Sequence, residues 1–330
     1  MTPWGRHSCL PSAEGRNTFS TNIFRLCRTA DRNVCATVKT MTKTTHFADR
    51  LLDACQTKGA PVCVGLDPVL ERLPDAIDKT DPVAAIEAFC LGVIEAVAPV
   101  VPAVKPQSAC FERYGASGVA VYHKVVAQAK DAGLIVVGDA KRGDIGTSSA
   151  HYAHGLLADP QGCDTLTVNG YLGGDGIEPF QSVAAAEGKG LFVLVRTSNP
   201  GGDAIQSLEL KDGRTVSEAV GDVVADLGSA CVGTRGYSNI GMVVGATKPE
   251  DAAKLRERYP QQLFLVPGFG AQGGGAEDVR ACFKAGGTGA LITASRSVIY
   301  AFEAPDPNWQ RAVTVAAEQL RDDVAGILRG

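Results

Sequence analysis

The chain has 330 residues, of which 45% are hydrophobic and 21% are charged, and its formal net charge is −4. This composition is typical of a soluble globular protein and can fill one large barrel or two smaller domains. The mild acidity provides no electrostatic footprint for nucleic acid, and no apolar run approaches the roughly 18–20 residues of a membrane helix. We therefore expect neither a nucleic-acid partner nor a membrane span.

Residues 1–40 differ in composition from the rest of the chain. They hold six basic side chains against two acidic ones, many Ser and Thr residues, and no secretory apolar region. Such a composition resembles an organelle transit peptide, but Met41 also begins a plausible chain, and we favour an upstream extension. We predict a disordered or targeting-like extension over 1–40 and a single barrel domain over 41–330.

From residue 60 onward, short apolar runs alternate with longer Ala-rich stretches of helical spacing. Apolar strands that alternate with helices indicate a parallel sheet whose outer face is covered. Eight such runs and a last helix over 309–328 fit an α/β fold of the single (β/α)8 TIM barrel type better than an open doubly wound sheet. The predicted strands are 61–66, 100–104, 134–137, 165–168, 191–195, 241–244, 263–266 and 290–293.

Polar side chains come directly after most of the predicted strands. In a closed barrel the carboxyl ends of the strands surround one concave face, so several such residues indicate one site rather than separate solvated turns. The residues are Asp67, Lys105, Asp139, Lys141, Asp144, Asn169, Arg196, Thr197, Ser198, Gln272, Ser295 and Arg296.

The charges are densest after the third predicted strand. Asp139 and Lys141 are two positions apart, so on extended backbone they point to the same face, and Lys105 can reach them from the neighbouring strand. Asp144 comes just before a helical stretch that starts near Gly146, so it fits a helix N-cap as well as a site residue. In a partly dry site, a Lys-Asp-Lys-Asp cluster keeps the lysines charged and positioned.

An unusually long connection follows the fifth predicted strand. After Ser198 the chain runs through 203–213 before helical spacing resumes. Long loops on compact scaffolds often act as lids, and this one leaves the end of the strand where active sites of barrels lie. The alternative is a surface elaboration.

Gly268, Gly270 and Gly273 form a GxGxxG string after the seventh predicted strand. A dinucleotide site also needs an acidic residue about 20 positions further on, at the end of the next strand, where this chain has Arg296. A glycine-rich turn combined with an arginine instead predicts a phosphate site, in which backbone N–H groups and the guanidinium hold the oxygens. A plain βα turn is the alternative.

The ten cysteines are scattered, with no CxxC pair and no histidine at zinc-ligand spacing. In a chain of this length, that pattern predicts reduced core thiols in a cytoplasmic compartment. His151 and His154 lie one helical turn apart, but no carboxylate or cysteine joins them at ligand spacing. We therefore expect no metal site.

Eight segments of the chain, most of them at strand ends, resemble those of the orotidine 5′-phosphate decarboxylase family in its longer bacterial form. The central segment, Asp139 to Gly146, is similar to the DxKxxD motif of that family. The likeness extends over about residues 45–325. The other segments begin at Val64, Lys105, Phe111, Thr167, Val195, Val244 and Pro267.

This resemblance implies decarboxylation of orotidine 5′-monophosphate to UMP by a homodimer with shared active sites, without metal or organic cofactor. It implies that Lys141 protonates the carbon that loses CO₂ and that Asp139 lies against the leaving carboxylate. Lys105 and Asp67 hold the ribose hydroxyls, and Asp144 enters the site of the partner subunit.

The resemblance also assigns residues to the rest of the substrate. Ser198 contacts the pyrimidine, and Gln272 and Arg296 hold the phosphate. The ribose-contacting threonine of the family corresponds to Thr147-Ser148, which leaves open which of the two hydroxyls serves. The remaining substrate-binding residues are Ser148, Asn169 and Pro267.

Two other functions fit the pattern. A sugar-phosphate decarboxylase or synthase of the same superfamily also has a DxKxxD barrel but uses Mg²⁺, although the segments at Lys105 and Ser198 favour the nucleotide enzyme. The second is a non-catalytic barrel that binds nucleotide phosphates. A binding module has no reason to keep so costly a cluster of charges, which argues against it.

Overall fold

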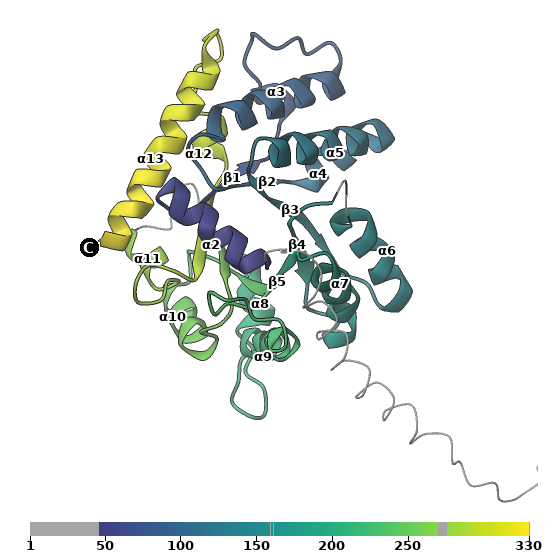
Figure 1. Ribbon diagram of the computed structural model, residues 1–330, viewed down its shortest axis with the longest axis vertical. Coiled ribbons are helices and arrows are strands. Elements are labelled where there is room, and N and C mark those ends of the chain that lie inside the picture. Colours follow the sequence, from purple (N-terminus) through teal and green to yellow (C-terminus); the bar gives the residue numbers. More distant parts are fainter. Residues whose placement is uncertain (1–45, 159, 161, 270–275, 330) are drawn as a thin grey trace, which may run out of the picture. The chain divides into compact units, whose positions relative to one another are not determined.

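Eight parallel strands close into a barrel in the computed structural model, which describes residues 46–158, 160, 162–269 and 276–329 (Figure 1). Each strand pairs with the next one in the chain, and the eighth pairs with the first, which confirms the predicted TIM barrel. The predicted extension over 1–40 and the start of the barrel domain at 41 lie outside the described residues. The strands are β1 (Val62–Leu66), β2 (Ala103–Pro106), β3 (Ile135–Arg142), β4 (Thr165–Asn169), β5 (Gly190–Arg196), β6 (Ile240–Val244), β7 (Phe264–Pro267) and β8 (Ala290–Ala294).

All eight predicted strands are present, and the largest difference lies at β3. Its apolar run predicted an end at residue 137, but the strand continues to Arg142, which pairs with Val168 of β4. Lys105 likewise lies inside β2 rather than after it. Pairing with a neighbouring strand therefore extends both strands beyond their apolar runs and places charged residues on regular backbone.

Helices surround the barrel and cover its outer face (Figure 1). Their starts follow ordinary capping chemistry: Asp81 accepts the N–H groups of Val83 and Ala84, and Thr215 forms a capping box with Glu218. The longer helices are α2 (Phe47–Lys58), α3 (Pro82–Val97), α5 (Gly115–Asp131), α6 (Gly146–Leu157), α7 (Gly174–Ala186), α9 (Val216–Gly228), α10 (Pro249–Arg258) and α13 (Trp309–Arg329). The short ones are α4 (Ser108–Glu112), α8 (Asp203–Gln206), α11 (Ala276–Arg280), α12 (Arg296–Ile299) and the 3-10 turns η2 (Leu70–Arg72) and η3 (Pro200–Gly202).

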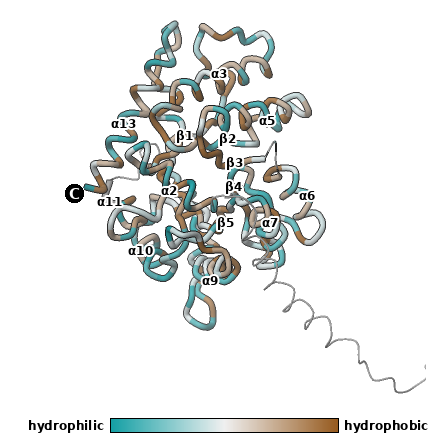
Figure 2. The backbone as a smooth tube through the Cα atoms, viewed as in Figure 1, coloured by the Kyte–Doolittle hydropathy of each residue, from teal (hydrophilic) through white to brown (hydrophobic). Residues whose placement is uncertain are grey.

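The apolar core has two layers. The larger layer lies between the strands and the surrounding helices, and hydrophobic residues accordingly stand out near β1 and β2 in Figure 2. The smaller layer fills the inside of the barrel and includes residues of α2. The ring of Phe47 on α2 meets that of Phe192 on β5 edge to face, with centroids 6.0 Å apart. Helix α2 therefore closes the barrel at the amino ends of the strands and leaves the carboxyl ends for a site.

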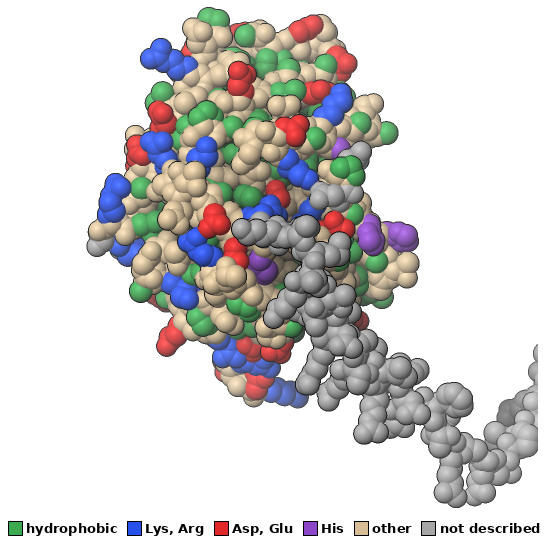
Figure 3. All heavy atoms as spheres, viewed as in Figure 1, with side chains coloured by type: hydrophobic (Ala, Val, Ile, Leu, Met, Phe, Trp, Pro, Cys, Tyr) green, Lys and Arg blue, Asp and Glu red, His purple; other side chains and the backbone are tan. Residues whose placement is uncertain are grey.

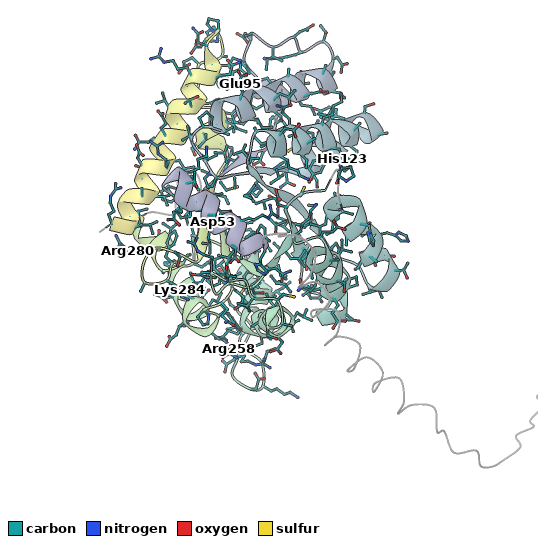
Figure 4. All side chains as sticks on the ribbon, viewed as in Figure 1. Asp53, Glu95, His123, Arg258, Arg280 and Lys284 are labelled. Carbon is teal, nitrogen blue, oxygen red and sulfur yellow. The ribbon has the colours of Figure 1, made fainter. Side chains whose placement is uncertain are left out.

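A buried carboxylate holds α2 in this position. Asp49 accepts the backbone N–H groups of Thr234 and Arg235, each at 2.8 Å, and the Thr234 hydroxyl at 2.8 Å. Burial would raise the pKa of the Asp49 carboxyl, but these hydrogen bonds lower it. Asp53, which is labelled in Figure 4, lies one turn further along α2 and pairs with Arg235 at 2.5 Å.

Charged residues of both signs are scattered over the face displayed in Figure 3. Arg258 of α10, labelled in Figure 4, reaches Asp222 of α9 at 2.8 Å, and Arg214 meets the same carboxylate at 2.7 Å. No helix within the described ranges combines the length and the apolarity needed to cross a bilayer.

Candidate active site

A cavity of about 560 Å³ lies at the carboxyl ends of the strands. Every strand of the barrel contributes to its lining, so the polar strand ends share a single concave site. Of the residues that the sequence assigned to the site, the following line the cavity: Asp67, Lys105, Asp139, Lys141, Thr197, Ser198, Pro267, Ser295 and Arg296. Three others, Asp144, Ser148 and Asn169, are not among the described residues that line it. Gln272 lies outside the described residues.

Two lysines share one carboxylate at the centre of the cavity. Lys105 Nζ lies 2.5 Å from Asp139 Oδ2, and Lys141 Nζ forms an ion pair with Asp139 Oδ1. The side chains of Lys105 and Asp139 are 10% and 7% exposed, whereas that of Lys141 is 46% exposed. Lys141 is therefore the member of this lysine–aspartate–lysine chain that a bound molecule can reach most easily.

The two lysines keep the shared carboxylate ionised. Burial would raise the pKa of Asp139, but the charges of Lys105 and Lys141 outweigh it and bring the pKa down to about 2. Burial would lower the pKa of Lys105, but the nearby carboxylates of Asp139 and Asp67 raise it instead. Both ions are thus charged at neutral pH despite their burial.

The backbone at Lys141 adopts an unusual conformation. Its φ angle is +48°, a left-handed value that no other described non-glycine residue shows. The strand pairing of β3 with β4 shifts register between Gly138 and Arg142, and the Lys141 N–H is donated to Thr167 Oγ1 at 2.9 Å. Lys141 therefore reaches Asp139 through this irregularity, and the extended backbone that we predicted is wrong at this position.

Two residues that the sequence pattern does not single out, Gln107 and Thr167, also belong to the site. Gln107 Nε2 donates a hydrogen bond to Asp139 Oδ2 at 3.1 Å, and Thr167 Oγ1 lies 3.2 Å from Asp139 Oδ1. Both side chains line the cavity. Thr167 could have been found from alternation, because the polar residues Thr165, Thr167 and Asn169 share one parity in a strand that is otherwise apolar.

Asp67 presents an oxygen without a partner to the cavity. Its Oδ1 atom is buried and has no hydrogen-bond partner among the described residues. Its backbone is held in place, because Tyr300 donates its hydroxyl to the Asp67 carbonyl at 2.9 Å and accepts the Val69 N–H at 2.8 Å. A buried acceptor on a fixed loop is suited to a hydroxyl group of a ligand.

The far side of the cavity combines a glycine turn with a cation. Gly268 follows β7 with a φ angle of +103°, a conformation that other residues rarely adopt. Arg296 is exposed and follows β8, which pairs with β7 through Thr293 and Pro267. Both residues line the cavity. Gly270 and Gly273 of the predicted phosphate turn lie outside the described residues.

The loop after β5 also borders the cavity. Ser198 and Asn199 line it, together with Gln206 of α8, a short helix inside the segment that we predicted to be irregular. Arg196 does not face the cavity, so its inclusion among the converging strand-end residues is wrong. The physical reason is a register shift between β5 and β6 at Leu194 and Arg196.

Asp144 and Ser148 lie at the connection from β3 to α6, and Asn169 ends the neighbouring strand β4. Ser148 is exposed, Asp144 accepts the N–H of Ile145 at 2.8 Å, and Asn169 accepts that of Tyr171 at 2.9 Å. The N-cap of α6 is Ile145 and has no side-chain hydrogen bond, so Asp144 does not cap the helix. The exposed large apolar residues of this region are Ile145, Tyr152, Tyr171 and Leu172.

No cluster of three or more His, Cys, Asp or Glu residues in the described part of the chain is arranged to hold a metal ion. The chemistry that the described site offers is that of a fixed pair of cations, one of them accessible, around one ionised carboxylate. Such a chain of charges in the mouth of a parallel barrel defines a (β/α)8-barrel enzyme.

Comparison with known proteins identifies the family. Residues 60–309 match the model of the Orotidine 5′-phosphate decarboxylase / HUMPS family, and the chain belongs to this family, as we predicted. The chain is 43% identical over 300 residues to orotidine 5′-phosphate decarboxylase of Rhodopirellula baltica, and the aligned region covers 85% of this chain and 99% of the relative. The corresponding enzyme of Deinococcus radiodurans is 42% identical over 86% of this chain and 99% of its own. The solved structure of Leishmania donovani OMP decarboxylase superposes with a TM-score of 0.71 at 31% identity and covers 87% of this chain and 100% of its own.

Proposed function

We propose that this enzyme decarboxylates orotidine 5′-monophosphate to UMP, in pyrimidine biosynthesis, without metal or organic cofactor. The observation that carries the proposal is the lysine–aspartate–lysine chain of Lys105, Asp139 and Lys141 in the barrel mouth. The relatives named orotidine 5′-phosphate decarboxylase match over nearly their whole length, which supports this substrate over those of other enzymes of the fold.

In the proposed step, the bond between the pyrimidine ring and its carboxylate breaks. CO₂ leaves, and the electron pair stays on the ring carbon. Because the pyrimidine offers no electron sink at this carbon, a fixed cation must stabilise the developing charge. Lys141 supplies that charge and then transfers a proton from Nζ to the carbon, and water returns the proton to the lysine.

Asp139 and Lys105 prepare Lys141 for this role. Asp139 holds the Lys141 ammonium group in place before the substrate arrives, so little reorganisation accompanies the reaction. Its own charge lies against the leaving carboxylate, and Lys105 keeps that charge in place by pairing with its second oxygen. The three side chains and Asp144 of a second subunit together form the charged network of the site.

The remaining residues bind the rest of the nucleotide. Asp67 and Lys105 hold the ribose hydroxyls, which is supported by the unpartnered Oδ1 atom of Asp67. Ser198 contacts the pyrimidine, and Arg296 and Gln272 hold the phosphate beside Pro267. The phosphate lies far from the reacting carbon, so its binding energy can drive closure of the loop after β5.

The direct test is the loss of orotidine 5′-monophosphate absorbance when purified protein is added. We expect turnover that is unchanged after treatment with EDTA, because the lysine–aspartate–lysine chain supplies the charge that a metal would otherwise provide. If the protein instead needs added Mg²⁺ and acts on a sugar phosphate, this proposal is wrong and the Mg²⁺-dependent function of the same superfamily replaces it. Binding of UMP without any turnover would favour a non-catalytic barrel.

We propose further that two copies of the chain complete each site. Asp144 does not line its own cavity, and neither does Ser148 in the first turn of α6 nor Asn169 at the end of β4. Tyr171 and Ile145 are 79% and 57% exposed there, which is unusual for large apolar residues outside an interface. This supports a homodimer in which Asp144 enters the partner's site and Ser148, or its neighbour Thr147, contacts the partner's ribose.

Mixing two inactive variants tests the shared site. We expect Lys141→Ala and Asp144→Ala to be inactive alone, whereas co-expression restores about a quarter of wild-type activity, because half of the dimers are mixed and each mixed dimer has one intact site. Absence of any restored activity in dimers shown to be mixed would contradict the shared site. A monomer in analytical ultracentrifugation at assay concentration would contradict the dimer itself.

The compartment that fits this function is the cytoplasm. Six described cysteines are free thiols, and most of them are buried, as expected for a protein kept in a reducing environment. Burial raises the pKa of thiols such as Cys55 and Cys63 to about 12, so they stay protonated and unreactive. The six thiols are those of Cys55, Cys63, Cys90, Cys110, Cys163 and Cys282.

A further inference from the structure

We propose that Arg196 is a positioning residue that sets the place of Ser198 from outside the barrel. The inference rests on the proposed function, in which Ser198, on the loop after β5, contacts the pyrimidine of the substrate. Arg196 itself makes no contact with the substrate. It acts through a hydrogen-bonded relay that runs from the scaffold helix α10 to the residues on either side of Ser198.

The direction of the Arg196 side chain results from an irregularity in β5. Phe192 packs inside the barrel and Leu194 lines the cavity, so strict alternation would point Arg196 into the cavity as well. However, Leu194 pairs with Val243 and Arg196 pairs with Val244, which leaves one extra residue on β5. This extra residue turns Arg196 outward, and re-aiming a side chain beside an active site is a common use of such irregularities.

Arg196 fills the space behind the loop, between the end of β5 and helices α8, α9 and α10, which lie together in Figure 1. Its side chain is only 3% exposed. The Nε atom donates to Asp251 of α10 at 2.7 Å, and one Nη atom forms an ion pair with Asp203 of α8. The other Nη atom donates to Gln206 of α8 at 3.3 Å. One guanidinium thus joins two side chains of the loop helix α8 to one side chain of the scaffold helix α10.

Gln206 connects Arg196 to the residues on either side of Ser198. Its Oε1 atom accepts the Thr197 N–H at 2.9 Å, and its Nε2 atom donates to Thr197 Oγ1 at 2.8 Å. Thr197 Oγ1 in turn donates to Asn199 Oδ1 at 2.6 Å. The two neighbours of Ser198 are therefore fixed by side chains that Arg196 holds.

A tight contact on the other side leaves Ser198 little freedom. A Cβ atom on Gly245 would lie 2.8 Å from the N, Cα and Cβ atoms of Ser198, so the loop lies directly on the backbone after β6. Thr247 donates its hydroxyl to the Ser198 carbonyl at 3.3 Å. Ser198 is held between this backbone and the Arg196 relay, and a small shift of the relay would move it relative to the pyrimidine.

The geometry of the guanidinium matters more here than its charge. The carboxylates of Asp203 and Asp251 are 46% and 39% exposed, so water screens these ion pairs and each contributes little to stability. A lysine would keep the positive charge, but a single ammonium group cannot replace the planar fork that meets three partners at once. Arg196→Lys is therefore expected to impair binding of the pyrimidine nucleotide more than folding.

Steady-state kinetics with orotidine 5′-monophosphate and thermal unfolding test the proposal together. We expect Arg196→Lys and Arg196→Met to lower kcat/KM by about 10- to 100-fold, mainly by raising KM, because a misplaced contact group carries a cost of this order. Asp251→Asn removes the scaffold end of the relay without altering the cavity lining, and we expect a smaller rise in KM, about 3- to 10-fold.

Arg256 provides the matched control. It is also buried, at 7% exposure, but it lies at the opposite end of the barrel, where it donates to the carbonyls of Tyr259, Gln262 and Gly289. We expect Arg256→Lys to lower the unfolding temperature and to leave KM unchanged. If the Arg196 variants instead lose stability like Arg256→Lys and keep a normal KM, Arg196 has a structural role only, and the proposal is wrong.

A double-mutant cycle with Ser198→Ala decides whether Arg196 acts through Ser198. If it does, Arg196→Lys raises KM in the wild-type background and has almost no further effect when Ser198 is already alanine. If the effects of the two substitutions on KM are fully additive, Arg196 does not act through Ser198 and the proposal is wrong. Wild-type protein that does not turn over orotidine 5′-monophosphate would contradict the proposed function itself, so the two failures can be distinguished.

Discussion

Replacement of Lys141 by alanine is expected to abolish turnover while leaving UMP binding detectable. The variant loses the accessible cation of the lysine–aspartate–lysine chain. In the proposed mechanism this cation is both the electrostatic stabiliser of the developing carbanion and its proton source. Each of these contributions accelerates a reaction by about 10²-fold or more, so we expect kcat to fall by at least about 10⁴-fold. UMP lacks the carboxylate, and in the proposed binding mode its ribose and phosphate are held by Asp67, Lys105 and Arg296 rather than by Lys141.

Single-turnover absorbance measurements and calorimetric titration with UMP check this prediction. Lys124→Ala is the matched control, because Lys124 lies on the outside of α5 with a 62% exposed side chain, and its pairing with Glu87 should matter for neither property. Lys141→Arg keeps the charge but holds its proton too tightly to transfer it, so we expect it to stay at least about 10²-fold below wild type. Near-normal turnover in Lys141→Ala would contradict the assignment.

Replacement of Asp139 by asparagine is expected to lower both stability and activity. The amide cannot neutralise Lys105, which would then be buried beside a neutral group with only Asp67 nearby. Breaking a buried ion pair in this way typically costs about 3–5 kcal/mol of unfolding free energy. Lys141 also loses the group that positions it, so we expect kcat to fall by at least about 10²-fold.

Chemical unfolding as a function of pH provides a second measurement. The pKa of Asp139 is about 2 in the folded protein, below the value of about 3.9 for an aspartate in an unfolded chain. Its contribution to stability is therefore fully present above about pH 4 and is lost as the pH falls through about 2. The stability difference between wild type and Asp139→Asn should shrink over this range, and a constant difference would contradict the ionised pair.

A double variant separates the electrostatic cost from simple misfolding. Lys105→Met combined with Asp139→Leu replaces the buried pair by apolar groups, which is often neutral for stability. We expect it to recover most of the stability lost in Asp139→Asn without recovering any activity. If the double variant is as unstable as the single one, the loss arises from packing rather than from the unpaired lysine.

The strands and their order follow from local sequence pattern. A strand is recognised from a short apolar run bounded by turn residues, and these runs are independent of one another, so eight of them could be located without knowing the pairing. The closure of a parallel barrel then brings the carboxyl ends of the strands together. This is why Asp67, Lys105, Asp139 and Arg296 could be assigned to one site although up to 229 positions separate them in the chain.

Where side chains point was decided by the tertiary structure. Alternation along a strand predicts direction only while the register with the neighbouring strand is unbroken. An extra residue opposite β6 turned Arg196 away from the site, and the shifted pairing with β4 placed Lys141 in a left-handed conformation. Both irregularities depend on contacts between strands and leave no local mark in the sequence.

The barrel, the family and the chemical type of the residues at the strand ends could be predicted from the sequence, because these depend on local pattern and on short motifs. The tertiary structure adds the hydrogen bonds of Thr167 and Gln107 to Asp139, the absence of Asp144 from the lining of its own cavity, and the contacts of Arg196 behind the loop. The physical reason is that hydrogen bonds between distant segments are set by register and packing, which no single stretch of the chain specifies.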